Sequence, residues 1–320
     1  MTQYIVRRLL ISIPLLIGIS IIGFTLINLA PGDPVRAMLP PEETAQFTLQ
    51  EIEAARERLG LNQPLPIRYV RWLGEALTGN LGYSYHFKRP VLEMVLRRLP
   101  ATLGLMGAAL SLGLAAGIGF GVISAVRRYS KLDYGLTASA FLMVSVPEFF
   151  FALLGMFVFA VILSWFPTFG MWTPGEPTGF NLDLLHHLVL PVMALSLRDI
   201  AGFMRYARSS TLDALSADFV TTARAKGLEE WVVLWKHAFR NALIPIVTIV
   251  GLSLPSLIGG SVVVESIFSW PGVGLLGYDA ILGRDYPVQM GVLMILAVVV
   301  LTANLVTDVA YALVDPRIRH

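Results

Sequence analysis

Six long apolar stretches constrain this 320-residue chain more than any other feature of its sequence. They cover residues 9–30, 101–126, 134–166, 187–203, 244–268 and 288–313. A bilayer core about 30 Å thick needs roughly 20 apolar residues in a helix, so each stretch has the length of a membrane span. Charged residues make up 14% of the chain, whereas soluble domains average about 25%. The sequence therefore predicts an all-α integral membrane protein with six transmembrane helices.

Basic residues predict the orientation of these helices. Thirteen of them fall at the ends and connections of one side: Arg7, Arg8, Arg127, Arg128, Lys131, Arg205, Arg208, Arg224, Lys226, Lys236, Arg240, Arg317 and Arg319. The opposite short loops, residues 167–186 and 269–287, carry only Arg284. Because cytoplasmic loops are rich in Lys and Arg, both termini are expected in the cytoplasm. Residues 31–100 are then expected outside, with short helices at 49–59 and 67–77.

Several function classes find no support in the sequence. Cysteine is absent and the net charge is only +2, so neither thiolate metal sites nor nucleic-acid binding is indicated. No Gly-x-x-x-x-Gly-Lys-Ser/Thr phosphate loop occurs, so any ATP would be handled by another chain. No His-Glu-x-x-His motif or nucleophile–base set points to an enzyme. A secondary transporter would also have six spans, but it gives no reason for the loop described next.

The inner segment 204–243, which we call the coupling loop, contains two predicted short helices. Residues 218–226 favour a helix that ends at Gly227, and Glu229 is expected to begin a second one. Glycine suits the bend because it adopts positive φ without a Cβ penalty. The second helix carries one apolar stripe at helical spacing: Trp231, Leu234, Trp235, Ala238 and Phe239. Such a loop either lies on the lipid surface or docks into a groove on a soluble partner.

Four ionisable residues lie at predicted membrane depth, where charges are costly and mark candidate translocation paths. Glu148 follows Pro147, which is expected to break the overlong third span. Its carboxylate either contacts a cationic substrate group or is held by a neighbouring helix. Arg198 and Asp199 form either a buried relay or the end of a shortened fourth span. Glu265 lies near the outer end of the fifth span and is interpreted as a gate or cap residue.

Two adjacent histidines, His186 and His187, fall at the predicted outer membrane edge. Neighbouring residues on a helix point about 100° apart, so this pair is a poor chelate. We interpret both as polar anchors and predict neither a metal site nor a cofactor in this chain.

The coupling loop resembles the conserved cytoplasmic loop of ATP-binding-cassette (ABC) importer permeases of the dipeptide, oligopeptide and nickel family. The resemblance rests on residues 223–227 (Ala-Arg-Ala-Lys-Gly) and 240–245 (Arg-Asn-Ala-Leu-Ile-Pro). The general Glu-Ala-Ala triplet is replaced by Thr221, Thr222 and Ala223. The peptide subgroup, however, typically reads Thr-Ala-Arg-Ala-Lys-Gly, as residues 222–227 do. Further similar motifs span the chain at residues 31–34, 59–64, 79–82, 99–103, 268–274, 284–287 and 315–319.

This resemblance implies a type I-like importer permease fold in one domain over residues 1–320, in the inner membrane of a bacterium or archaeon. Its expected partners are a second, homologous permease, two cytoplasmic ATP-binding subunits that use the ATP, an extracytoplasmic substrate-binding protein and membrane lipid. The implied substrates are peptides first, with nickel complexes or small glycans as alternatives. The residues implied to couple the permease to the ATPases are Thr222, Ala223, Arg224, Ala225, Lys226, Gly227, Glu229, Trp231 and Trp235.

Overall fold

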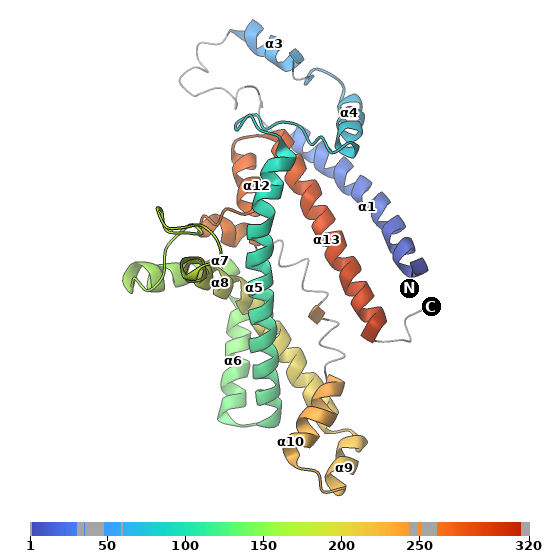
Figure 1. The fold of residues 1–320 in the computed structure, drawn as a ribbon, viewed down its shortest axis with the longest axis vertical. Coiled ribbons are helices and arrows are strands. Elements are labelled where there is room, and N and C mark those ends of the chain that lie inside the picture. The colour runs from blue at the N-terminus through green and yellow to red at the C-terminus, as the bar shows by residue number, and fades with distance from the viewer. Residues whose placement is uncertain are drawn as a thin grey trace. The chain divides into compact units, whose positions relative to one another are not determined.

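The structure is a computed structural model that describes residues 2–30, 35, 48–58, 60–242, 249–250 and 261–314. Apart from an isolated β-bridge between Tyr83 and Pro90, the regular structure of these residues is helical (Figure 1). The helices are α1 (Thr2–Leu29), α3 (Leu49–Arg58), α4 (Leu65–Leu77), α5 (Val91–Val126), α6 (Lys131–Ser145), α7 (Glu148–Gly155), the π-helix η1 (Met156–Ile162), α8 (Leu182–Leu215), α9 (Asp218–Ala225), α10 (Glu230–Val232), the π-helix η2 (Val233–Phe239), α12 (Val273–Leu282) and α13 (Tyr286–Val314). The chain divides into two compact units, unit 1 with residues 103–270 and 302–320 and unit 2 with residues 2–102 and 271–301.

The predicted spans appear as long apolar helices. Four helices are long and apolar enough to cross a membrane, namely Ile5–Leu29, Val91–Val126, Leu182–Leu215 and Tyr286–Val309. They contain most or all of the first, second, fourth and sixth predicted spans. In the fifth, residues 244–248 and 251–260 lie outside the described residues, while 249–250 and 261–267 are helical. Motifs 31–34 and 315–319 also lie outside the described residues, as does residue 59.

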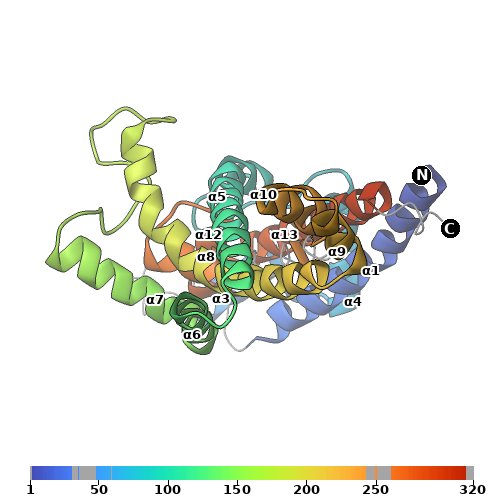
Figure 2. The same ribbon diagram turned by 90° about the horizontal axis from the view of Figure 1, so that it is seen from below.

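The third predicted span is broken at Pro147, as its sequence indicated. The pair α6 and α7–η1 bends by 103° between Ser145 and Glu148. In Figure 2 α6 is seen along its axis while α7 lies across the view. Pro147 cannot donate a backbone hydrogen bond, and it restrains Val146 to an extended conformation with ψ 132°. Glu148 is therefore the first residue of a new helix.

Helix α8 is longer than the sequence predicted. It runs unbroken through Arg198 and Asp199 to Leu215, so the beginning of the segment 204–243 is helical. In this added length Arg208 forms an ion pair with Asp133, whose carboxylate is buried. Arg208 donates from Nε to Asp133 Oδ1 at 2.8 Å and from Nη2 to Oδ2 at 2.9 Å. Asp133 also accepts hydrogen bonds from the Ser124 hydroxyl and the Tyr129 backbone N–H. This Asp133–Arg208 clasp ties α6 to α8.

Glycines let α5 approach α8 closely in unit 1. A Cβ at Gly117 would lie 2.8 Å from the Ile200 carbonyl oxygen, and one at Gly121 would lie 2.6 Å from the Met204 carbonyl oxygen. Gly113, Gly117 and Gly121 recur every fourth residue, so they form one glycine face on α5. Small residues at such spacing allow helix backbones to pack together in membranes.

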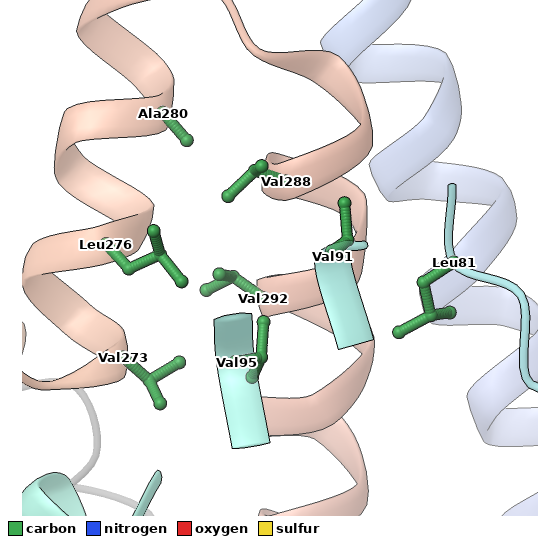
Figure 3. Close-up of a cluster of buried hydrophobic side chains, with 8 residues drawn as sticks. All are labelled: Leu81, Val91, Val95, Val273, Leu276, Ala280, Val288 and Val292. Atoms are coloured by element: carbon green, nitrogen blue, oxygen red, sulfur yellow. The ribbon is translucent and has the colours of Figure 1, made fainter. Parts of the chain in front are cut away.

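Unit 2 has its own apolar core (Figure 3). Val91 and Val95 of α5 pack with residues of α12 and α13, and Leu81 joins them from the preceding loop. The Thr102 hydroxyl accepts a hydrogen bond from Val273 N–H at 2.8 Å, at the first residue of α12. Residues 269–287 were predicted to form a loop, whereas residues 273–282 form α12. A helix of ten residues is too short to stand out in the sequence as a membrane span.

The orientation of the helices remains a prediction with a direct test. A reporter fused after residue 320 should be active in the cytoplasm, because most basic residues fall on the side of the termini. A reporter inserted near residue 176 should be active outside. Paired alkaline phosphatase and fluorescent-protein fusions measure both positions, and the reverse pattern would exclude the six-span topology.

Candidate functional site

The first half of the coupling loop ends in a Schellman-type helix cap at Gly227. This glycine has φ 76°, which confirms the predicted turn at positive φ. Gly227 N–H donates to Arg224 O at 2.9 Å, and Leu228 N–H donates to Ala223 O at 3.4 Å. These are the two hydrogen bonds of the Schellman motif. The cap stops α9 after Ala225, with Lys226 as its capping residue.

The two parts of the coupling loop pack on a small core. Val220 and Ala223 of α9 contact Val233 and Ala238 of η2, and all four are buried. Ala223 is only 4% exposed, so its small side chain packs within the loop. The angle between α9 and η2 is thus fixed by side chains of the loop itself.

The apolar stripe predicted on the second helix is divided between two faces. Residues 233–239 are π-helical, and this i→i+5 pattern places Val233 and Ala238 together in the loop core. The aromatic members instead form a ladder, which we call the aromatic ladder. Trp231 and Trp235 have ring centroids 5.2 Å apart, and Trp235 and Phe239 are 5.0 Å apart. Trp231 is 68% exposed, so the ladder presents apolar surface outward.

An ion pair joins α9 to α10 across the Gly227 turn. Arg224 Nε donates to Glu230 Oε2 at 3.1 Å, and Arg224 Nη2 donates to Glu230 Oε1. The pair lowers the pKa of the Glu230 carboxyl below its ordinary value. Both side chains are exposed, so the pair contributes little stability, but its bidentate geometry restrains the turn. Glu229 precedes α10 as its capping residue, as predicted, and the Thr222 hydroxyl donates to Asp218 O at 2.9 Å.

A second candidate site is an ionic cluster, formed by Glu148 of α7 and by Arg198 and Asp199 of α8. The three groups lie within electrostatic reach of one another between α7 and α8. Glu148 Oε1 and Asp199 Oδ2 are buried and have no hydrogen-bond partner among the described residues. Unpaired buried carboxylate oxygens are rare and need an explanation. This cluster carries two acids and one base, so it is able to hold a further cationic group.

Two further observations concern Asp199 and Glu265. The sequence left Asp199 either in a buried relay with Arg198 or at the end of a shortened span, and in the structure it lies within electrostatic reach of Glu148. Glu265 is fully buried in the helical residues 261–267. Phe268, which follows this segment, lines an apolar cavity of about 330 Å³ with Phe151 of α7 and Leu190 of α8.

Glu148→Gln tests whether the ionic cluster contacts substrate. The amide keeps the shape of the side chain but removes its charge. If the carboxylate binds a cationic group, uptake of cationic substrates should fall about tenfold, which corresponds to a lost charge-assisted hydrogen bond. Basal ATP hydrolysis and assembly of the transporter should stay unchanged. The matched control is Glu176→Gln, which alters an exposed loop carboxylate. If the Glu148 variant leaves uptake of both cationic and neutral substrates unchanged, a purely structural role would be favoured.

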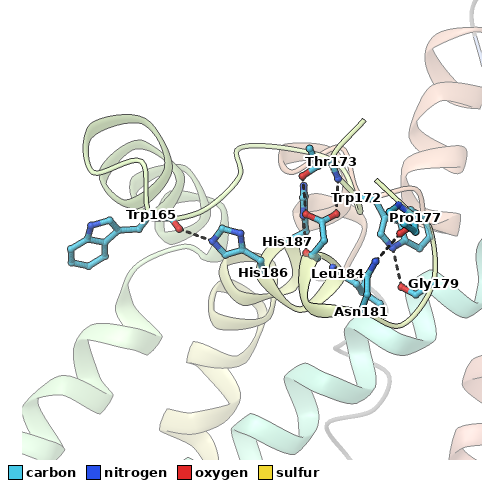
Figure 4. A network of polar contacts seen from close by, with 10 residues as sticks. Trp165, Trp172, Thr173, Pro177, Gly179, Asn181, Leu184, His186 and His187 are labelled. Atoms are coloured by element: carbon cyan, nitrogen blue, oxygen red, sulfur yellow. Dashed lines mark hydrogen bonds and ion pairs between the residues drawn. The ribbon is translucent and has the colours of Figure 1, made fainter. Parts of the chain in front are cut away.

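The two histidines have separate partners in the loop before α8 and its first turn (Figure 4). His186 Nε2 donates to Trp165 O at 2.7 Å, and His187 Nδ1 donates to Asp183 O at 2.9 Å. Among the described residues no group of three His, Cys, Asp or Glu is arranged to hold a metal ion. These contacts match the interpretation of both rings as polar anchors.

Comparison with known families matches nearly the whole chain. Residues 117–320 match the family described as "Binding-protein-dependent transport system inner membrane component". Residues 1–106 match the family described as its N-terminal membrane component.

Curated relatives are similar over their full length. The "Oligopeptide transport system permease protein AppB" of Bacillus subtilis is 48% identical over 322 residues, covering 100% of both chains. The "Dipeptide transport system permease protein DppB" of Alkalihalophilus pseudofirmus is 37% identical over 337 residues, again covering 100% of both.

A solved structure has the same fold. It is a chain of the MetNI methionine ABC transporter in an inward-facing conformation, with a TM-score of 0.58 and 19% sequence identity. The match covers 70% of this chain and 97% of that one. At this identity the similarity shows the fold alone, which is that of a type I importer permease.

Proposed function

Since this chain belongs to the family of binding-protein-dependent transport system inner membrane components, we propose that it is the permease subunit of an ATP-driven importer of di- and oligopeptides. It is a multi-pass protein of the inner membrane. In the proposed importer, residues 1–320 act as one permease domain. The translocation path lies between this chain and a second, homologous permease. Two cytoplasmic subunits bind and hydrolyse the ATP, and a binding protein delivers substrate from outside.

The coupling loop is the observation that carries this proposal. It has an internal core, a capped turn at Gly227 and an outward aromatic ladder. A loop packed in this way can move as one body when a partner moves it. An exposed row of aromatic side chains is typical of a surface that another protein covers. The aromatic ladder is therefore proposed to dock on an ATPase subunit.

The proposal that the substrate is a peptide rests on two observations. The relatives named above are called oligopeptide and dipeptide permeases. In addition, the ionic cluster holds both signs of charge, with Glu148 and Asp199 within electrostatic reach of Arg198. A peptide is zwitterionic, so its amino group finds carboxylates there and its carboxylate finds a guanidinium. The chain itself is proposed to need no cofactor, since ATP is used by its partners.

Reconstitution tests the proposal. The chain is assembled in liposomes with a homologous second permease, two ATPase subunits and a peptide-binding protein. ATP inside the liposomes should drive accumulation of a labelled tripeptide such as trialanine, and uptake should require all components. Nickel chelates and short glycans serve as competitors. Accumulation of one of these instead of the peptide would overturn the substrate, and uptake without ATP would overturn the class.

A further inference from the structure

Unit 2 contains a second polar site that the proposed transport mechanism does not use. It is a cavity of about 210 Å³ between α1, α4, the loops around residues 60–63 and 81–85, and the first turn of α13. A single water needs only roughly 10–15 Å³, so this space holds a larger group. Three motifs that carry the family resemblance, at residues 59–64, 79–82 and 284–287, contribute to its lining. Segments about 200 residues apart therefore meet here.

Hydrogen-bond donors without acceptors line this cavity. Trp72 Nε1 is buried and has no partner among the described residues. Arg68 uses one N–H, which donates from Nη2 to Asn28 Oδ1, and its remaining N–H groups have no recorded acceptor in the described part of the chain. Burying a donor without a partner costs about 1–3 kcal/mol, so such groups indicate a missing ligand.

Two tyrosine hydroxyl groups also line the cavity as hydrogen-bond donors. Arg68 lies within electrostatic reach of Tyr85 and Tyr286, which both line the cavity. Burial raises the pKa of Tyr85 to about 12, so its hydroxyl keeps its proton at neutral pH and remains a donor. Burial also lowers the pKa of Arg68, yet a guanidinium stays charged under all ordinary conditions.

One acceptor is also free. Gln63 Oε1 is buried and unpartnered among the described residues, and Gln63 lines the same cavity. A simple anion satisfies the donors but leaves this acceptor unpaired. A peptide C-terminus satisfies both, because its last residue carries a carboxylate and a backbone N–H on the same Cα. The guanidinium of Arg68 is the donor whose planar geometry best fits a carboxylate.

We propose that this cavity is a binding site for the C-terminal carboxylate of a peptide, held by Arg68, Trp72 and Tyr85 with Gln63 accepting the last peptide N–H. The inference rests on the proposed function in that the peptide is the transported substrate. The segment between α1 and α5 is predicted to lie outside the membrane, so the site meets peptides before they enter the translocation path. It is separate from the ionic cluster, because all its residues belong to unit 2.

The test compares a peptide with its amide in the complete transporter. Trialanine and trialanine amide differ only in the terminal carboxylate. Arg68→Gln should lower trialanine uptake about tenfold or more, the loss of a charge-assisted hydrogen bond, and should leave uptake of the amide within about twofold. Tyr85→Phe, which removes one donor, should lower trialanine uptake about threefold to tenfold. Arg58→Gln is the matched control, since it removes an exposed Arg of α3 outside the cavity, and it should change neither uptake.

A binding measurement supports the comparison. Trialanine added to the wild-type complex without its binding protein should change tryptophan fluorescence, and Trp72→Phe should remove that change. If Arg68→Gln fails to assemble, Tyr85→Phe decides the matter in both assays. An equal loss of acid and amide uptake, or no loss of either, would overturn the carboxylate site while leaving peptide transport intact. A wild-type complex that moves neither peptide would instead overturn the proposed function and this inference with it.

Discussion

Gly227→Val should abolish substrate-stimulated ATP hydrolysis in the assembled transporter while leaving membrane insertion intact. Gly227 has φ 76°, and a β-branched residue there costs about 1–2 kcal/mol or more in backbone strain. Among the described residues, no atom other than those of Gly227 and its two chain neighbours lies within 4 Å of a Cβ built at this position. The effect therefore comes from the backbone and not from a clash. Relief of the strain opens the Schellman cap and changes the angle between α9 and α10. ATPase assays with and without binding protein and peptide, together with membrane fractionation, measure both expectations.

Gly227→Asn is the matched control for this effect. Asparagine tolerates positive φ better than other residues with a Cβ, so most stimulated activity should survive. If stimulated ATP hydrolysis decreases in the order glycine, asparagine, valine at position 227, the backbone conformation is identified as the cause. Normal stimulated turnover in a correctly assembled Gly227→Val complex would refute the role of the turn in coupling.

Gly121→Ala should be the most destabilising single-methyl change in unit 1. The new Cβ would lie 2.6 Å from both the Met204 carbonyl oxygen and the Ala207 Cβ. A backbone oxygen cannot move aside as a flexible side chain can, so α5 and α8 must separate. Overpacking of this kind typically costs about 1–3 kcal/mol. The separation also strains the Asp133–Arg208 clasp, because Arg208 N would lie 3.0 Å from the new methyl. A lower thermal midpoint and a lower yield of purified protein report the loss.

Gly119→Ala supplies the control for packing. It lies on the same helix, two residues away, and has no atom within 4 Å of a built Cβ. Replacing this helical glycine should be neutral or slightly stabilising, since alanine favours helix. If the two variants melted alike, the close packing of α5 on α8 would not be a source of stability.

The helices of this fold could be predicted from the sequence where hydropathy and backbone chemistry decide them. Long apolar stretches predicted α1, α5 and α13, and Pro147 predicted the break before α7. Gly227 likewise predicted the turn in the coupling loop. Glycine and proline each determine the backbone conformation at their own position, so their effects can be read from the sequence. The glycine face of α5 also carried a visible signal, Gly-x-x-x-Gly repeated twice, which the sequence analysis did not use.

The remaining features depend on partners that are distant in the sequence. Arg208 was counted only as a basic residue of a loop, because nothing local shows that Asp133, 75 residues earlier, neutralises it. The apolar stripe was assigned to a single face because its spacing was read with the α-helical period, whereas η2 is π-helical. The candidate path residues were Glu148, Arg198 and Glu265, and only the fold brings Asp199 within electrostatic reach of Glu148.

The Asp133–Arg208 clasp fixes one point of α8 to α6, so that point can act as a pivot for α8. One end of α8, at Leu215, leads directly into α9, and Asp199 lies near the middle of the helix. Arg208 lies between them, roughly 13 Å from Asp199 and roughly 10 Å from Leu215 at 1.5 Å per residue. When α8 turns about Arg208, a displacement at Leu215 produces a displacement of similar size in the opposite direction at Asp199. Such a lever transmits motion without amplifying it. The displacement that reaches Asp199 therefore depends on the stiffness of α8. Loosening the pivot would uncouple the two ends even where every contact with ATPase and substrate is kept.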